Sequence, residues 1–197
     1  MQNSIYKTFY QHLTENKQEI PDFLFEIQDL SHEQLQKMKE IEASAFPPHM
    51  QMMNSELGDN DLTMDMVLDY ITNNVPGLSP NDVDIYVGNS WYMITHYEDG
   101  GRELHIDDVA AMGGQFGRGV AFAFISVLSG LMQKAETCHA DAREGTSYVM
   151  LKDAEKNGRL TIQHDRKWDW GGVKMHEVEF TMDPEIVQRL NRRKNKQ

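Results

Sequence analysis

Four glycines gather within residues 113–119 of the sequence, between two apolar runs of different character. The run before them, residues 104–112, alternates like a strand, and the run after them, residues 120–132, has the apolar content of a buried helix. A glycine-rich loop in this position turns backbone N–H groups and the positive end of a helix dipole toward an anion. The segment therefore predicts a phosphate or pyrophosphate site, with a tight strand-to-helix turn that binds nothing as the alternative.

Charged side chains alternate along the strand that leads into the glycine loop. The period of two places Asp108 on one face and three other groups on the opposite face, namely Glu103, His105 and Asp107. A second polar alternation follows the apolar run and consists of His139, Asp141 and Arg143. Carboxylates in such a row can relay a proton or attract a cation, and they can equally be solvated surface groups.

The overall charge excludes one class of partner. The 197 residues carry a formal net charge of −12 and an isoelectric point near 5.0. This argues against nucleic acid, whose binders need a basic face, and the short basic run at residues 192–196 is interpreted as a solvated terminus. Cys138 is the single cysteine, so no intrachain disulfide is possible and a reducing, cytoplasmic compartment is expected. The longest apolar run is too short to span a bilayer, so no membrane association is expected.

Capping residues and apolar spacing predict the helices that position these groups. Ser31, with Gln34 three residues later, forms a capping-box pattern, and Thr63 caps a second helix. Residues 146–157 predict a later helix, which Gly158 closes at its C′ position. The helix that begins after Ser31 is predicted to extend to Phe46. Its residues at helical spacing are Leu35, Met38, Ile41, Glu42 and Ala45.

Alternation and turn residues predict seven strands. They lie at residues 23–28, 83–87, 91–97, 103–112, 137–142, 160–164 and 175–182. The last two are expected to be linked by an aromatic loop that contains Trp168 and Trp170. The chain is accordingly divided into an N-terminal helical extension at residues 1–20, one domain at residues 21–183, and a C-terminal turn with the basic tail at residues 184–197.

Three segments of that domain resemble the GNAT superfamily of N-acetyltransferases. Residues 38–47 resemble the first helix of these enzymes, residues 114–119 resemble their acyl-CoA pyrophosphate loop, and residues 147–158 resemble the helix that carries their catalytic tyrosine. The resemblance implies an α+β fold, with a mixed and mostly antiparallel central sheet of about seven strands flanked by helices. It also implies transfer of an acetyl group from acetyl-CoA, or another acyl-CoA, to an amine of a small molecule or a protein.

The resemblance further implies where the cofactor and the acceptor bind. Asp107 or Glu103 would take the amine proton, and the backbone N–H near Ala111 would stabilise the oxyanion. The acceptor site would be lined by His105, Asp141, Arg143, Trp168 and Trp170. Acetyl-CoA would be held by the strand end, the glycine loop and the start of the later helix, through Ala110, Ala111, Met112, Gly114, Gln115, Phe116, Gly117, Arg118, Gly119, Val120 and Ser147.

The sequence departs from the GNAT pattern at two places that concern catalysis. Gly114 replaces a Gln or Arg of the pyrophosphate loop, and Ala154 stands where the family's tyrosine protonates the leaving thiolate. Tyr148 lies about two turns upstream on the same helix and is interpreted as a packing residue. A second hypothesis is therefore a GNAT-fold protein without catalysis, which acts as a binding or inhibitory module of the counter-defence type.

The remaining residue groups are less specific. The eight histidines lack any metal-binding spacing, so no metal is expected. Cys138 is expected to be a buried strand residue rather than a nucleophile. The loop with Trp168 and Trp170 has three interpretations, as a lid over the acceptor, a patch for a protein partner, or an anchor for the loop itself. The identity of the acceptor and the oligomeric state stay open.

Overall fold

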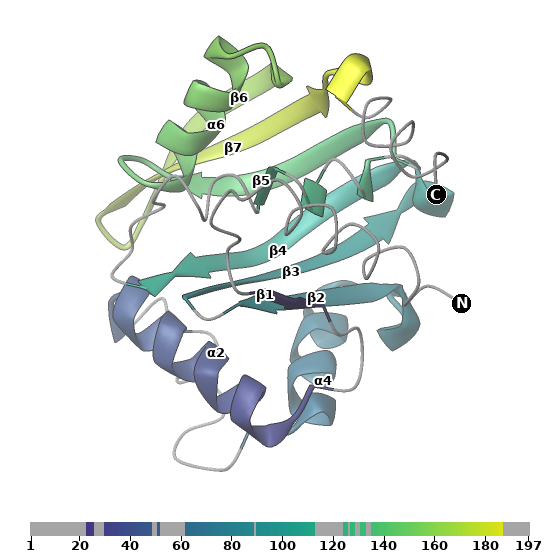
Figure 1. The fold of residues 1–197 in the computed structure, drawn as a ribbon, viewed down its shortest axis with the longest axis vertical. Coiled ribbons are helices and arrows are strands. Elements are labelled where there is room, and N and C mark those ends of the chain that lie inside the picture. Colours follow the sequence, from purple (N-terminus) through teal and green to yellow (C-terminus); the bar gives the residue numbers. More distant parts are fainter. Residues whose placement is uncertain are drawn as a thin grey trace, which may run out of the picture.

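A seven-stranded mixed sheet forms the centre of the fold (Figure 1). The computed structural model describes residues 23–25, 30–48, 51, 62–88, 90–112, 124–125, 127–128, 131–132 and 135–186. The strands are β1 Phe23–Phe25, β2 Val83–Gly88, β3 Trp91–Glu98, β4 Glu103–Ala111, β5 Thr137–Arg143, β6 Leu160–Trp170 and β7 Val173–Met182. Their order is β1-β2-β3-β4-β5-β7-β6, and every neighbouring pair is antiparallel except β4 and β5. This confirms the predicted mixed, mostly antiparallel sheet.

Two helices cover one face of the sheet. The first, α2 (His32–Ala45), begins at a capping box in which Ser31 and Gln34 each accept a hydrogen bond from the other's backbone N–H. The second, α4 (Met64–Asn74), begins at Thr63, whose hydroxyl accepts a backbone N–H from the first turn. The residues of α2 that lie at helical spacing are all buried, namely Leu35, Met38, Ile41, Glu42 and Ala45. Caps and apolar spacing were therefore reliable guides to both helices.

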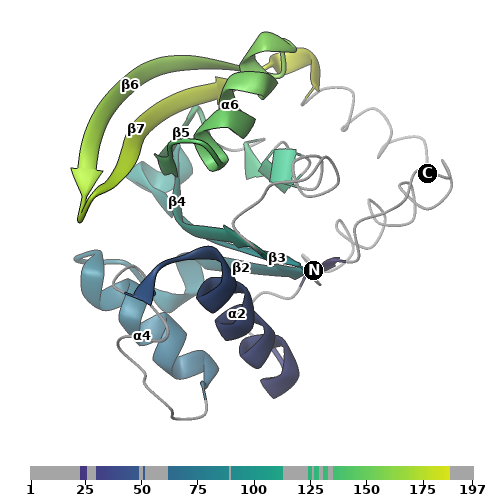
Figure 2. The same cartoon turned by 90° about the vertical axis from the view of Figure 1, so that its left-hand side faces the viewer.

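A third helix, α6 (Ser147–Lys156), lies on the opposite face (Figure 2). It shares a buried core with the strands and with described residues between 124 and 135, of which residues 124–125, 127–128 and 131 are helical, as predicted. Gly158 follows α6 with a φ of 64°, the left-handed conformation expected at the C′ position. Cys138 is fully buried in the same core. The sheet thus separates this core from the one beneath α2 and α4.

The pairing of β4 with β5 covers only part of either strand. Four residue pairs join them in parallel, and the ladder ends at Ile106 and Ala140. Beyond that pair the two strands diverge (Figure 1), and β4 continues alongside β3 as far as Ala111. The edge of β4 after Ile106 therefore has no ladder partner among the described strands.

The pairing of β4 with β3 contains a bulge. Ile94 lies opposite Asp108, whereas the next residue, Thr95, lies opposite Ile106, so Asp107 is the extra residue. A bulge interrupts the alternation of side chains between the two faces of a strand. The prediction that Asp108 faces away from Asp107 is therefore wrong, because Asp108 contacts Tyr92 and Asp107 contacts His96, two residues that lie on the same face of β3.

The strand β6 is longer than its sequence predicts. The alternation predicts a strand that ends at His164 and a loop with Trp168 and Trp170, but β6 continues to Trp170 and turns directly into β7. The turn residues Gly171 and Gly172 both have positive φ, at 57° and 88°, as tight hairpin turns require. Because β6 is an edge strand with successive exposed residues, its sequence lacks the alternation of a half-buried strand.

Several predictions lie outside the described residues. These are the N-terminal extension at residues 1–20, the glycine loop at residues 113–120, and the basic tail at residues 192–196. The predicted C-terminal turn begins at Pro184 and is described as far as Ile186. Within the described chain, no helix is long and apolar enough to cross a bilayer.

Candidate functional site

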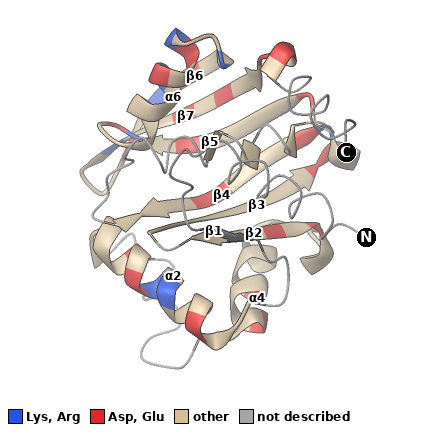
Figure 3. Ribbon diagram, viewed as in Figure 1, with Lys and Arg blue, Asp and Glu red and all other residues tan. Residues whose placement is uncertain are grey.

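A cleft of about 320 Å³ opens where β4 and β5 part. Its walls come from the end of α2, from α4 and its following turn, and from strands β4 to β7. Acidic segments of β4 and β5 border it (Figure 3). The cleft brings together six residues that the sequence proposes for the site, namely Asp107, Asp141, Arg143, Ser147, Trp168 and Trp170.

Asp108 is the cleft carboxylate with the most unusual surroundings. The hydroxyl of Tyr92 on β3 donates to its Oδ2 at 2.5 Å, and the buried Glu42 of α2 contributes a second negative charge nearby. Burial raises the pKa of the Asp108 carboxyl to about 7, with Glu42 acting in the same direction and the Tyr92 hydrogen bond acting against it. Near neutral pH this group can therefore both accept and release a proton.

Tyr92 itself stays protonated. Burial first, and then the charges of Asp108 and Glu42, raise the pKa of its phenol well above the usual value. Its side chain is fully buried in the core beneath α2 and α4, so the hydroxyl is held in place as a donor. The consequence is that Asp108 is fixed at the cleft by a partner that does not titrate near neutral pH.

Asp107 is held in a different way. The Nδ1 atom of the buried His96 lies 2.8 Å from both of its carboxylate oxygens, and the Nε2 atom of His96 lies 3.2 Å from Glu98. Burial lowers the pKa of His96, but the hydrogen bonds and charges of Asp107 and Glu98 outweigh it, so this pKa is raised overall. Asp107 is thus committed to an ion pair at the edge of the cleft.

Aromatic side chains form the wall of the cleft opposite β4. The Trp168 indole donates to Oδ1 of Asp141 at 3.1 Å, and the rings of Trp168 and Trp170 stack with their centroids 6.1 Å apart. Burial raises the pKa of Asp141, with the Trp168 hydrogen bond acting against it. Arg143 donates to the carbonyl of Ala45 at 3.2 Å and so joins β5 to the C-terminal end of α2.

The unpaired edge of β4 fits an extended ligand. Ala110 and Ala111 are small and buried, so their side chains do not keep a ligand away from the backbone. Met112 follows them and is 39% exposed, with its N–H donating to the carbonyl of Ser90. Ser147 lies across the cleft at the start of α6, where its hydroxyl accepts the N–H of Arg143 at 2.9 Å. These residues are compatible with the acyl-CoA site that the resemblance implies.

The helix α6 offers no acid to the cleft at the position where the family has a tyrosine. Ala154 is buried in the core beneath this helix. The Tyr148 hydroxyl donates to Asp165 on β6, and its ring stacks on His176 of β7 with centroids 3.5 Å apart. That hydrogen bond, aided by burial, raises the pKa of Tyr148 to about 12. Tyr148 is therefore a packing residue here and does not replace the missing acid.

Five described residues proposed from the sequence do not line the cleft: Ala110, Ala111 and Met112, which continue β4 beyond it, and Glu103 and His105, which precede it. Glu103 and His105 stand at the start of β4, beside His139 of β5. Glu103 precedes Asp107 by four residues, which is about 13 Å along a strand. Neither can therefore act on a group bound between β4 and β5.

Sequence reasoning missed Asp108, Tyr92 and Glu42 as one group. The available signal was the pair of adjacent aspartates, which interrupts the polar alternation of the strand, because two neighbouring carboxylates can share a cleft only where the alternation breaks. The position of the bulge depends on the register with β3, which the sequence of β4 alone does not contain.

Comparison with known proteins identifies the fold. No protein-family model matches the sequence, and no curated protein matches it. Among solved structures, a spermidine N-acetyltransferase chimera from Vibrio cholerae superposes with a TM-score of 0.55 and 8% identity, covering 84% of this chain and 98% of that one. The ribosomal-protein-S18-alanine N-acetyltransferase from Escherichia coli superposes with a TM-score of 0.48 and 12% identity. This match covers 82% of this chain and 94% of that one. The first of these likenesses, with the observed sheet, shows that the chain has the GNAT acetyltransferase fold.

Proposed function

We propose that this protein is an N-acetyltransferase that transfers an acetyl group from acetyl-CoA to a cationic amine bound in the cleft, with Asp108 as the general base. The observation that carries the proposal is the position of Asp108, a half-buried carboxylate at the point where β4 and β5 part. The fold supports the reaction class, and the residues of the cleft support the kind of acceptor.

The acyl donor has a matching place beside the cleft. The backbone of Ala110, Ala111 and Met112, the loop from Gly114 to Val120, and Ser147 would hold acetyl-CoA, which supplies an activated thioester when bound. The supporting observation is the edge of β4 after Ile106, which has no ladder partner among the described strands and can pair with an extended arm.

The acceptor site favours a positively charged group. Three carboxylates line the cleft, on Asp107, Asp108 and Asp141, and the two stacked indoles of Trp168 and Trp170 lie beside Asp141. Carboxylates attract an ammonium group through its charge, and an indole face attracts it through the ring quadrupole, worth about 0.5–2 kcal/mol. An amine of a small molecule, or of a protein, would enter as its ammonium form.

Asp108 then prepares the amine. An ammonium nitrogen has no lone pair, so it cannot attack an acyl carbon until a base removes one proton. The pKa of Asp108, about 7, keeps a large fraction of its carboxylate ionised at neutral pH and still makes it a better base than an ordinary aspartate. The Tyr92 hydroxyl donates to Oδ2 of Asp108 and so holds this carboxylate in one orientation.

Because Ala154 stands where the family has its tyrosine, we expect a low turnover rate. A missing general acid typically costs about 10²- to 10⁴-fold in rate, while the positioning of the reactants is retained. We therefore expect slow turnover and choose an assay with long incubation.

The test measures release of free thiol from acetyl-CoA in the presence of polyamines, amino sugars, and peptides with free N-termini or lysines. We expect turnover with at least one cationic amine, and we expect Asp108→Asn to lower it by about 10²-fold or more. Asp165→Asn is the matched control, because this aspartate also accepts a tyrosine hydroxyl but lies away from the cleft.

Two outcomes would overturn the proposal. Failure of acetyl-CoA to bind at about 1 mM, measured by calorimetry, would exclude the donor site. Binding of acetyl-CoA without turnover of any amine would favour the second hypothesis, a binding or inhibitory module on a GNAT fold. Transfer to peptides but not to small amines would assign the acceptor to the protein class.

A further inference from the structure

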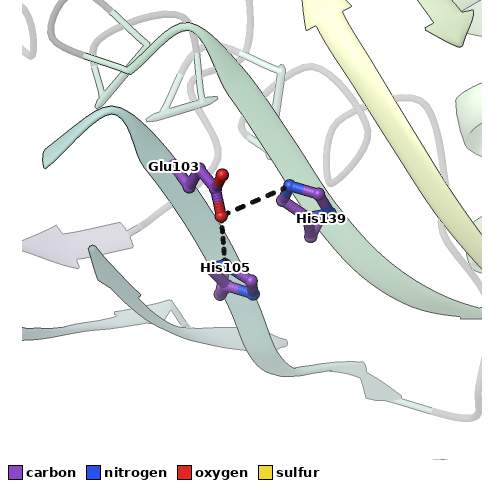
Figure 4. A group of neighbouring side chains, drawn as sticks. All are labelled: Glu103, His105 and His139. Carbon is purple, nitrogen blue, oxygen red and sulfur yellow. Dashed lines mark ion pairs between the residues drawn. The ribbon is translucent and has the colours of Figure 1, made fainter. Parts of the chain in front are cut away.

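We propose that Glu103, His105 and His139 form a binding site for one divalent transition-metal ion, with Zn²⁺ as the best match (Figure 4). Glu103 and His105 lie two residues apart on β4 and so share a face of the sheet. His139 stands directly opposite His105 in the parallel ladder between β4 and β5. The site lies at the paired end of that ladder, away from the cleft.

The three side chains already converge on a common point. The Oε2 atom of Glu103 lies 3.6 Å from Nε2 of His105 and 3.9 Å from Nε2 of His139, and the three ligand atoms all lie within 4.8 Å of one another. Tetrahedral zinc, with bonds of about 2.0–2.2 Å, keeps its ligands about 3.3–3.6 Å apart. Glu103 is thus already near the required separation from both nitrogens, and any larger closure, of at most about 1.5 Å, has to come from rotation of the His105 and His139 rings toward each other.

The Nε2 atom of His105 has two carboxylate oxygens nearby, on Glu98 and Glu103, but each lies at 3.6 Å and so beyond hydrogen-bond distance. It is buried, and among the described residues it has no hydrogen-bond partner. An unsatisfied buried polar atom costs about 1–3 kcal/mol, so such atoms commonly indicate an ion or a ligand. Glu98 of β3 also lies near this nitrogen but contacts His96, so water would complete the coordination of an ion held by the other three residues.

The histidine rings lie side by side in a stacked row across the sheet. His105 stacks between His96 and His139, with centroids 5.0 Å and 4.7 Å apart and planes inclined by 11° in both cases. His96 is in turn anchored by Asp107. An imidazole binds a metal through a lone pair in its ring plane, so the His105 and His139 rings have to rotate out of this parallel arrangement to reach one ion, while the ladder between β4 and β5 keeps their backbones side by side.

The donor set selects the class of ion. Two imidazoles and a carboxylate suit zinc and its neighbours in the first transition row, whereas calcium and magnesium prefer oxygen ligands alone. The spacing of the histidines does not reveal this site in the sequence, because His139 joins the other two ligands only through the pairing of β4 with β5.

The experiment uses the full-length chain without a histidine tag, treated with a chelator and then dialysed. Titration with Co²⁺ is followed by visible absorption, and titration with Zn²⁺ is followed by calorimetry. We expect one ion per chain with micromolar or tighter affinity, and intense Co²⁺ bands typical of a four-coordinate site. His105→Ala and His139→Ala should each weaken binding by about 100-fold. His164→Ala, a change of an exposed histidine on β6, should leave the affinity unchanged.

Circular dichroism checks that each variant is folded. Glu103→Gln serves as a further variant, because glutamine has nearly the same shape as glutamate. If the alanine variants do not fold, a Zn²⁺ affinity of Glu103→Gln equal to that of the wild type overturns the proposal, and a loss of about tenfold or more supports it. Absence of saturable one-to-one binding by the wild type overturns it directly. So does equal affinity in the wild type, His105→Ala and His139→Ala.

Discussion

Two buried histidines in this protein make the same local contact in different surroundings. His96 on β3 places Nδ1 at 2.8 Å from Asp107, and His176 on β7 places Nδ1 at 2.6 Å from Asp165. Both aspartates lie eleven residues away, on the adjacent antiparallel strand. The contact itself therefore says little about function.

The difference lies in what surrounds each pair. His96 stacks on His105, and its partner Asp107 lines the cleft. His176 stacks on Tyr148, so its pair joins α6 to the hairpin of β6 and β7. We conclude that the pair of His96 and Asp107 supports the candidate site, whereas the pair of His176 and Asp165 supports the fold.

The largest expected effect concerns pH and the cleft. Only the ionised form of Asp108 accepts a proton, so kcat/KM should rise by about 100-fold from pH 5 to pH 8 and level off above its pKa of about 7. Asp108→Asn should remove this rise, whereas Asp165→Asn should retain it. An unchanged inflection in Asp108→Asn would assign the base to another residue. The groups that surround Asp108 are Glu42 from α2, Tyr92 from β3 and Asp107 from β4, with Asp141 and Arg143 also lining the cleft.

The same titration has a consequence for stability. The pKa of Asp108 is raised in the folded state, so the folded chain holds a proton that the unfolded chain releases at lower pH. Stability should therefore fall as pH rises from about 4 through 7, and Asp108→Asn should reduce that fall. Urea unfolding at pH 5 and pH 8 measures the effect. An identical pH dependence in the variant and the wild type would contradict the buried, protonated state.

Removal of the His176 side chain should lower the free energy of unfolding without lowering the turnover rate. His176→Ala leaves a cavity beneath Tyr148 and removes one of the two hydrogen-bond partners of Asp165, so the free energy of unfolding should drop by about 2–4 kcal/mol. Turnover per folded molecule, measured at low temperature, should stay unchanged because His176 does not line the cleft. A loss of turnover larger than the loss of folded protein would show that the two pairs do not differ in role.

His96→Ala should affect both quantities. The variant frees Asp107 from the ion pair that fixes it at the cleft, so turnover of the folded protein should drop about tenfold in addition to a loss of stability. The matched comparison is His176→Ala under the same conditions. Equal turnover in the two variants would contradict a positioning role for His96.

The smallest expected effect is at Tyr148. Tyr148→Phe removes one partly exposed hydrogen bond to Asp165 and keeps the ring stacked on His176. We expect a loss of about 1 kcal/mol or less in the free energy of unfolding and no change in turnover. A strong decrease in turnover would instead assign Tyr148 a role as the acid that Ala154 does not supply.

Local signals in the sequence predicted the helices well. Ser31 and Gln34 form the expected capping box, Thr63 caps α4, and Gly158 takes the left-handed conformation after α6. Each of these features depends on residues a few positions apart, which a single sequence contains in full. The same holds for the buried stripe of α2, because helical spacing fixes which side chains share a face.

The parts of the site that escaped prediction depend on contacts between distant segments. The bulge at Asp107 is a property of the register between β3 and β4, so the strand sequence alone placed Asp108 on the wrong face. The true length of β6 depends on its position at the edge of the sheet, where exposed residues are tolerated. The meeting of His105 with His139 depends on a parallel pairing across 34 residues.

The four residue pairs between β4 and β5 have a mechanical meaning as well. Within the part of the chain that the structure describes, they are the whole ladder between one part of the sheet, β1 to β4, and the other part, β5 to β7. A ligand that hydrogen-bonds to the edge of β4 after Ile106 and also contacts β5 would extend the sheet like an added strand. It would then connect the two parts at the point where β4 and β5 diverge. Thermodynamic linkage then couples its affinity to the rigidity of the molecule, so tight ligands should slow hydrogen exchange on both sides of the junction.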